Sequence, residues 1–169
     1  MLWLLDLMDA MVTIRPATPD DIPAIVQVVN RAYRIEAFFV IGDRTDERDI
    51  RERMARPNAS FLVIDDGPRL AGSVYFELRG QRGYFALLAV DPDRQKQGLA
   101  RSLIEAVQDH CRAAGCHDLD LDIVNLRQEL PAFYARLGFT PIATAPFHHA
   151  PKLKRDAHLI LMTRRIPQT

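Results

Sequence analysis

The chain has 169 residues, of which 48% are hydrophobic and 26% charged, as in a globular domain with one hydrophobic core. Basic and acidic residues number 22 each, so the sequence lacks the positive excess typical of nucleic-acid-binding and membrane-surface proteins. The two cysteines indicate neither a disulfide framework nor a zinc site, and free thiols fit a reducing cytoplasm.

The N-terminus is apolar but does not read as a membrane anchor. A bilayer span needs roughly 20 residues, whereas this segment ends at residue 11, contains two aspartates and lacks the basic start of a signal peptide. We expect residues 1–11 to be an N-terminal extension, with an amphipathic segment as the alternative. Residues 12–169 are expected to form a single domain without a nucleic-acid or membrane partner.

A short strand and two helices are predicted next. Residues 12–15 alternate between apolar and polar side chains, as in a strand. Thr18 can cap a helix, Pro19 suits its first turn, and the acidic residues that follow meet its positive end. The apolar face of this helix runs to Tyr33, and residues 46–56 form a second, charged helix.

The remaining pattern predicts a mixed sheet. Tight turns separate the next strands, which form an antiparallel meander at residues 61–64, 70–78 and 84–90. A helix from Leu99 leads back to a further strand at residues 117–124, and this crossover makes the sheet mixed. Two last strands are expected at residues 140–145 and 157–165.

No metal site is predicted. The alternating Asp118, Asp120 and Asp122 do not have the spacing of a calcium loop and are expected to face solvent. His148 and His149 are adjacent, so their side chains point apart on an extended chain and make poor co-ligands.

The turn after the third meander strand carries a chemical signal, Gln-x-x-Gly-x-Ala over residues 95–100. The first amides of a helix have no internal partner and lie at its positive end. Gly98 and Ala100 let an anion approach the backbone, and Lys96 and Arg101 add positive charge. The motif lacks the Gly-Lys-Ser/Thr of the nucleotide P-loop. From these residues alone, an ordinary strand–helix turn is the alternative.

A short helix near residues 130–137 is the second informative stretch. Pro131 places its start, and Gly138 ends it. Its inner face includes Phe133 and Tyr134, and spacing alone fits Tyr134 as an aromatic core residue.

Three segments together resemble the GCN5-related N-acetyltransferase (GNAT) family. They are the opening Arg-Pro-Ala-Thr-x-x-Asp at residues 15–21, the Gln-x-x-Gly-x-Ala turn, and Phe-Tyr-x-x-x-Gly-Phe at residues 133–139. The resemblance spans residues 12–166. It implies an α/β GNAT fold, which is a twisted, mixed sheet of six to seven strands flanked by about four helices. A cleft is then expected where the strands ending near Val90 and Val124 splay apart.

The resemblance also implies acetyl-CoA as co-substrate, without a metal. Its pyrophosphate would lie on the amides of the turn and its pantetheine arm along the preceding strand. Asn125 would hydrogen-bond this arm or nearby backbone. The residues implied to bind acetyl-CoA are Leu88, Ala89, Val90, Gln95, Lys96, Gln97, Gly98, Leu99, Ala100, Arg101, Ser102 and Asn125.

The implied reaction is direct attack of a primary amine on the acetyl thioester, with Tyr134 as general acid for the departing thiolate. Relatives often place a glutamate base on the strand that carries Leu88, but residues 84–90 contain none. Glu77 is our first choice, and Glu36, His148 or a water chain are alternatives.

The acceptor is expected near the connection that follows the first helix, where the candidates are Glu36, Phe38, Phe39, Asp43 and Arg44. The two phenylalanines could instead be core residues. A small molecule or a peptide amine fits, and relatives are often dimers, so a homodimer is open. A non-catalytic acyl-CoA-binding sensor or interaction module with the same fold is the alternative function. Such a sensor has no need of Tyr134, whose presence favours an enzyme.

Overall fold

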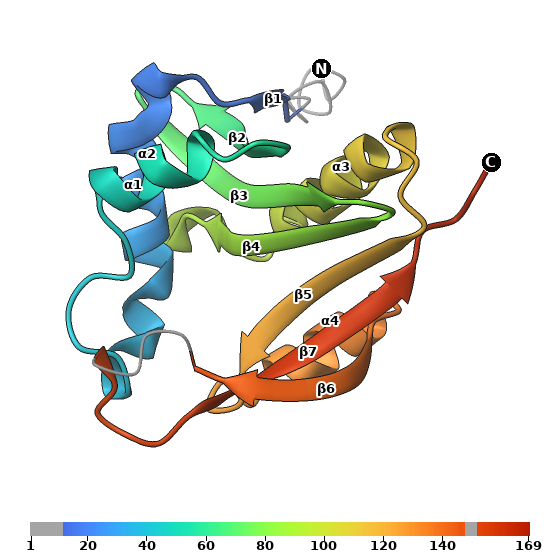
Figure 1. Ribbon diagram of the computed structural model, residues 1–169. Coiled ribbons are helices and arrows are strands. Elements are labelled where there is room, and N and C mark those ends of the chain that lie inside the picture. The colour runs from blue at the N-terminus through green and yellow to red at the C-terminus, as the bar shows by residue number, and fades with distance from the viewer. Residues whose placement is uncertain (1–11, 148–151) are drawn as a thin grey trace, which may run out of the picture.

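The computed structural model describes residues 12–147 and 152–169. They form a mixed seven-stranded sheet flanked by four α-helices, as predicted (Figure 1). The strands are β1 (Ile14–Pro16), β2 (Ala59–Asp66), β3 (Arg69–Arg79), β4 (Arg82–Val90), β5 (Asp118–Val124), β6 (Thr140–Pro146) and β7 (His158–Arg165). The helices are α1 (Ile22–Ala32), α2 (Glu47–Met54), α3 (Leu99–Ala113) and α4 (Leu130–Arg136), with short 3-10 turns at η1 (Pro19–Asp21), η2 (Tyr33–Phe38) and η3 (Pro92–Arg94).

The sheet has the order β1-β2-β3-β4-β5-β7-β6, and its one parallel contact among the described strands joins β4 to β5. That contact has only three register pairs, from Arg82↔Asp118 to Tyr84↔Asp120. Beyond them the two strands diverge, as Figure 1 shows. The splay predicted between the ends near Val90 and Val124 is therefore confirmed.

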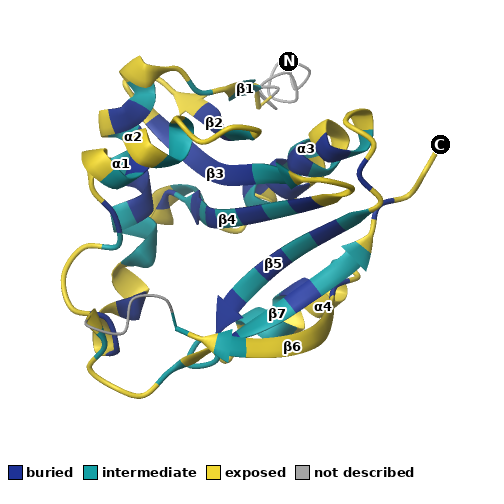
Figure 2. Cartoon of the chain, in the orientation of Figure 1, coloured by how far each residue is buried: buried dark blue, intermediate teal, exposed yellow. Residues whose placement is uncertain are grey.

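Two cores sandwich the sheet. The run Phe61-Leu62-Val63-Ile64 on β2 is buried throughout, because alternate residues face opposite cores. Phe61 and Val63 pack with α1, whereas Leu62 and Ile64 pack with α3. Figure 2 shows the central strands buried along most of their length and β6 exposed at the sheet edge. Among the described helices, none is long and apolar enough to cross a membrane.

Two expectations need correction. The helical face predicted to reach Tyr33 ends at Ala32, where the chain tightens into η2. Asp118 and Asp120 do not simply face solvent: they are partly buried and pair with Arg82 at 3.0 and 2.7 Å. The reason is that side chains of the neighbouring strands reach across this face: Arg82 comes from β4, and Thr163 on β7 donates to Asp120 at 2.6 Å. The predicted N-terminal extension and His148 lie outside the described residues.

Candidate active site

A cleft of about 440 Å³ opens where β4 and β5 diverge. The ends of these strands, α4 and the segment that follows α1 supply its walls. The cleft therefore lies at the predicted position, between the strand end near Val90 and that near Val124.

A bulge in β4 shapes the first wall. The register of β3 and β4 shifts between Ser73 and Tyr75, and Leu87 has a φ of +50°. This left-handed conformation costs a non-glycine residue about 1–2 kcal/mol, which the buried Leu87 side chain offsets by packing in the α1 core. Leu88 and Val90 consequently line the cleft, whereas the Ala89 side chain is buried in the core.

The turn before α3 exposes helix amides without a competing side chain. Gly98 is the N-cap of α3, and neither a capping side chain nor an acidic residue occupies the first turn. Lys96 and Gly98 both have positive φ values, +64° and +78°. A Cβ on Gly98 would meet no atom within 4 Å, so the space in front of the turn is open. Backbone in this form presents successive N–H groups to an anion.

The side chains of the turn divide into three groups. Gln95 and Ala100 line the cleft, and Lys96 and Gln97 are exposed. Leu99 is buried beneath the turn and anchors it to the α3 core. Two further predicted residues have partners within α3: the Ser102 hydroxyl donates to the Gly98 carbonyl at 3.1 Å, and Arg101 pairs with Glu105.

Tyr134 on α4 lines the cleft and is only 6% exposed. Its ring packs against Phe85, Phe133 and Phe139 with centroid distances of 5.0 to 6.3 Å. The expected core packing is therefore present, yet the hydroxyl has no hydrogen-bond partner among the described residues. Burial raises the pKa of this phenol, which keeps the proton on the oxygen. The site thus holds a fixed, protonated donor.

Glu36 on η2 is a buried carboxylate that lines the same cleft. Arg127 donates to it from Nη1 at 3.2 Å and also pairs with Glu129. Burial raises the pKa of Glu36, against the opposing effects of Arg44 and Arg127. A carboxylate that titrates above its ordinary range is suited to accept a proton near neutral pH.

Asp122 on β5 also lines the cleft, although the sequence pattern predicted that it faces solvent. It accepts a hydrogen bond from the Tyr84 hydroxyl at 3.0 Å. Asp118 and Asp120 lie on the same face, but both fall within the short parallel pairing. Of the three aspartates, Asp122 alone lies beyond this pairing. The alternation combined with the expected splay was the signal that could have placed it in the cleft.

Three predicted acceptor-site and base residues do not line the cleft. Glu77 on β3 accepts from the Tyr75 hydroxyl and pairs with Arg79 and Arg56. Burial opposes ionisation of Glu77, but the hydrogen bonds from Arg79 and Tyr75 hold its pKa below its usual range. Such a carboxylate is a weak proton acceptor.

The two phenylalanines have separate environments. Phe39 is 0% exposed and packs with Val40 and Val124, so the core alternative is correct for this residue. Phe38 is 45% exposed and contacts the edge of Phe39 from outside, at a centroid distance of 4.8 Å.

Asn125 bonds to backbone rather than lining the cleft. Its Oδ1 accepts from the His158 N–H at 2.8 Å, and its own N–H donates to the His158 carbonyl at 3.0 Å. These bonds join the end of β5 to the start of β7. Asn125 was expected to bond either the pantetheine arm or nearby backbone, and in the structure it bonds the backbone of His158.

Comparison with known proteins identifies the family of this chain. The sequence model of the Acetyltransferase (GNAT) family matches residues 25–139. The chain therefore belongs to the GNAT family, as its motifs predicted.

Particular relatives and structures are also similar. A mycothiol acetyltransferase of Propionibacterium freudenreichii is 29% identical over 133 residues, which cover 74% of this chain and 42% of the relative. One from Clavibacter michiganensis is 30% identical over 75% of this chain and 42% of the relative. The chain thus matches less than half the length of these curated relatives.

Two solved structures show the same fold. The ribosomal-protein-S18-alanine N-acetyltransferase from Escherichia coli has a TM-score of 0.75 at 21% identity, covering 94% of this chain and 96% of the other. A putative acetyltransferase from Salmonella typhimurium, solved with its cofactor acetyl-CoA, has a TM-score of 0.70 at 25% identity. It covers 94% of this chain and 95% of the other.

Proposed function

We propose that this protein transfers the acetyl group of acetyl-CoA to a primary amine by direct attack, with Tyr134 as general acid. The observation that carries the proposal is the Tyr134 hydroxyl, which is protonated, without a partner among the described residues, and on the wall of the cleft. The amide-rich turn at the N-terminus of α3 and the buried carboxylate of Glu36 line or border the same cleft. Family membership and the acetyl-CoA-bound structural neighbour support the choice of donor.

Acetyl-CoA fits the residues present. The turn offers N–H groups to the pyrophosphate, and Gly98 leaves open space in front of them. A second cavity, beside α3, is lined by Arg101, Arg136, Arg164 and Arg165 against a single acidic residue, Glu105. Its positive charge suits the additional phosphate on the ribose of coenzyme A. When bound, acetyl-CoA supplies an activated acyl group on sulfur.

Two side chains of the cleft carry out the proton transfers of the reaction, one as the base and the other as the acid. Backbone N–H groups near Leu88 and Val90 polarise the thioester carbonyl and support the developing oxyanion. Glu36 accepts the proton that the amine must lose as its nitrogen forms the new bond to the acetyl carbon. Tyr134 gives its proton to the coenzyme A sulfur as the carbon–sulfur bond breaks. We propose Glu36 as the base in place of Glu77, because it lines the cleft and its pKa is raised.

The first experiment is calorimetric titration with acetyl-CoA and with desulfo-CoA, followed by an amine screen read out as free thiol release. Micromolar binding together with thiol release supports the proposal. Binding without transfer to any amine supports the alternative, a non-catalytic acyl-CoA-binding sensor. Absence of binding contradicts both functions.

Glu36→Gln is expected to lower kcat/KM by about 10²-fold at neutral pH. The base works only when deprotonated, so wild-type activity is present above the raised pKa of Glu36 and is lost as the pH falls through it. The variant has no such titration, so the acidic limb of its pH–rate profile should flatten. Arg127 keeps Glu129 as a partner, which limits the structural damage.

Glu77→Gln decides between the two candidate bases. Glu77, like Glu36, is a carboxylate paired with arginine, but it does not line the cleft. If the acidic limb disappears in Glu77→Gln and persists in Glu36→Gln, our assignment is overturned and Glu77 is the base. Thermal unfolding of both variants checks that the fold is intact.

We also propose that residues 12–169 form one acetyltransferase domain of the cytoplasm. The support is a single sheet that extends from Ile14 to Arg165. Cys111 and Cys116 are both free and buried, which is compatible with a reducing compartment.

A further inference from the structure

The charged side chains of the cleft are not all paired. Glu36 and Arg127 neutralise each other at 3.2 Å, and Glu129 shares the same arginine from the more exposed rim. This cluster is complete without a ligand. Three other charged groups line the cleft and form no salt bridge among the described residues: Arg44, Asp122 and Arg136.

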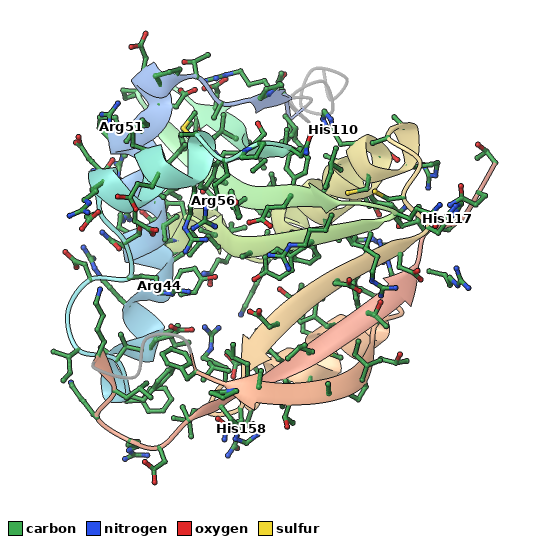
Figure 3. The ribbon with its side chains drawn as sticks, viewed as in Figure 1. Arg44, Arg51, Arg56, His110, His117 and His158 are labelled. Atoms are coloured by element: carbon green, nitrogen blue, oxygen red, sulfur yellow. The ribbon has the colours of Figure 1, made fainter. Side chains whose placement is uncertain are left out.

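Arg44 is the half-buried one of the two unpaired cations. Its guanidinium lies 5.4 Å from the ring centroid of Tyr33, and the side chain is half-buried. It forms no salt bridge with any carboxylate in the part of the chain that the structure describes. The positive charge of Arg44 lowers the pKa of Glu36, but the Glu36 carboxylate forms its salt bridge with Arg127 and not with Arg44. Figure 3 shows Arg44 beside the lower part of α1, level with the gap between β4 and β5.

The contact with the Tyr33 ring limits where the guanidinium can lie. A planar guanidinium presents parallel N–H groups that match the two oxygens of a carboxylate. Water competes less well for a half-buried arginine than for an exposed one. Arg44 therefore has the chemistry to bind a carboxylate of a ligand in the cleft.

Asp122 is the unpaired anion. It receives one hydrogen bond, from the Tyr84 hydroxyl at 3.0 Å, and no salt bridge from an arginine or lysine among residues 12–147 and 152–169. Arg136 also lines the cleft, but it is exposed and belongs as well to the basic cavity beside α3. Of the two unpaired arginines, Arg44 is therefore the one that belongs to the cleft alone.

We propose that the acceptor is a small zwitterion, an amine that also bears a carboxylate, with its carboxylate on Arg44 and its ammonium on Asp122. Such a molecule neutralises Arg44 and Asp122 at once, whereas a simple amine leaves Arg44 without an anion. Asp122 holds the ammonium, and Glu36, which lines the same cleft, takes its proton. This inference rests on the proposed acetyltransferase function and specifies its substrate class.

The test uses free α- and ω-amino acids, each compared with its own amide, which retains the amine and lacks the negative charge. The readout is kcat/KM from thiol release with acetyl-CoA in excess. The wild type is expected to favour one or more acids over their amides by about 10- to 100-fold, the range for one bidentate charge-assisted contact. In Arg44→Gln this ratio should fall to near 1, mainly through KM for the acid.

Arg51→Gln is the matched control. Arg51 is exposed on α2 and lies apart from Arg44 in Figure 3, so its loss changes net charge equally without touching the cleft. This variant should keep the wild-type acid-to-amide ratio. Arg44→Lys retains the charge but not the planar fork, so an intermediate ratio is expected.

The outcomes separate the inference from the function on which it rests. Wild-type indifference to the carboxylate, a ratio unchanged in Arg44→Gln, or acetylation of simple amines but of no amino acid overturns the zwitterion assignment and leaves the acetyltransferase intact. Failure of the protein to bind acetyl-CoA in the calorimetric titration overturns the proposed function itself.

Discussion

Tyr134→Phe is expected to reduce turnover by about 10²- to 10⁴-fold, the usual contribution of a positioned general acid. The affinity for acetyl-CoA should change little, because phenylalanine keeps the ring that packs on Phe85, Phe133 and Phe139. The hydroxyl has no partner among the described residues, so its removal leaves no buried polar group unsatisfied. Kinetics by thiol release and calorimetry with acetyl-CoA measure the two quantities separately.

Tyr75→Phe controls for the loss of a tyrosine hydroxyl elsewhere. Tyr75 is fully buried in the α1 core, and its hydroxyl contacts Glu77 outside the cleft. Turnover of this variant should stay near the wild-type value. Wild-type turnover in Tyr134→Phe would remove Tyr134 from the acid role and leave proton delivery to solvent.

Gly98→Leu is expected to weaken acetyl-CoA binding by about 10²-fold, which corresponds to the loss of one or two charge-assisted hydrogen bonds. The side chain would project into the open space in front of the turn. A φ of +78° also disfavours any residue with a Cβ, so the turn would rearrange. Calorimetric Kd values for acetyl-CoA and desulfo-CoA give the measurement.

Gly67→Leu separates backbone strain from ligand contact. Gly67 has a φ of +63° in the β2–β3 turn, and a Cβ there also meets nothing within 4 Å. Both variants should lose a similar free energy of unfolding, about 1–2 kcal/mol, but only Gly98→Leu should bind acetyl-CoA poorly. Equal affinity in the two variants would contradict the assignment of the turn as the pyrophosphate site.

Local signals in the sequence predicted most of the fold. Alternation, apolar runs and turn residues identify the strands and helices because these features act over a few neighbouring residues. The turn at Gly98 and the helix of Tyr134 were found for the same reason. Each is a short motif with a backbone requirement that the residues themselves reveal.

The acceptor end of the cleft depends on contacts that no local pattern encodes. Glu36 meets Arg127 across a separation of 91 residues. Asp122 differs from Asp118 and Asp120 only in lying beyond the last parallel pair. Phe38 and Phe39 are adjacent and chemically alike, yet one is exposed and the other buried. These distinctions come from tertiary packing.

The short parallel contact between β4 and β5 affects how readily the protein is degraded in a cell. Three register pairs join the halves of the sheet there, whereas β5 and β7 share seven. We expect partial unfolding to begin at this contact, and proteases act on chains opened in this way. A ligand that bridges the seam at a hundredfold excess over its Kd stabilises the closed form by about 2.7 kcal/mol. The steady-state abundance of this protein is therefore expected to follow the cellular supply of acetyl-CoA.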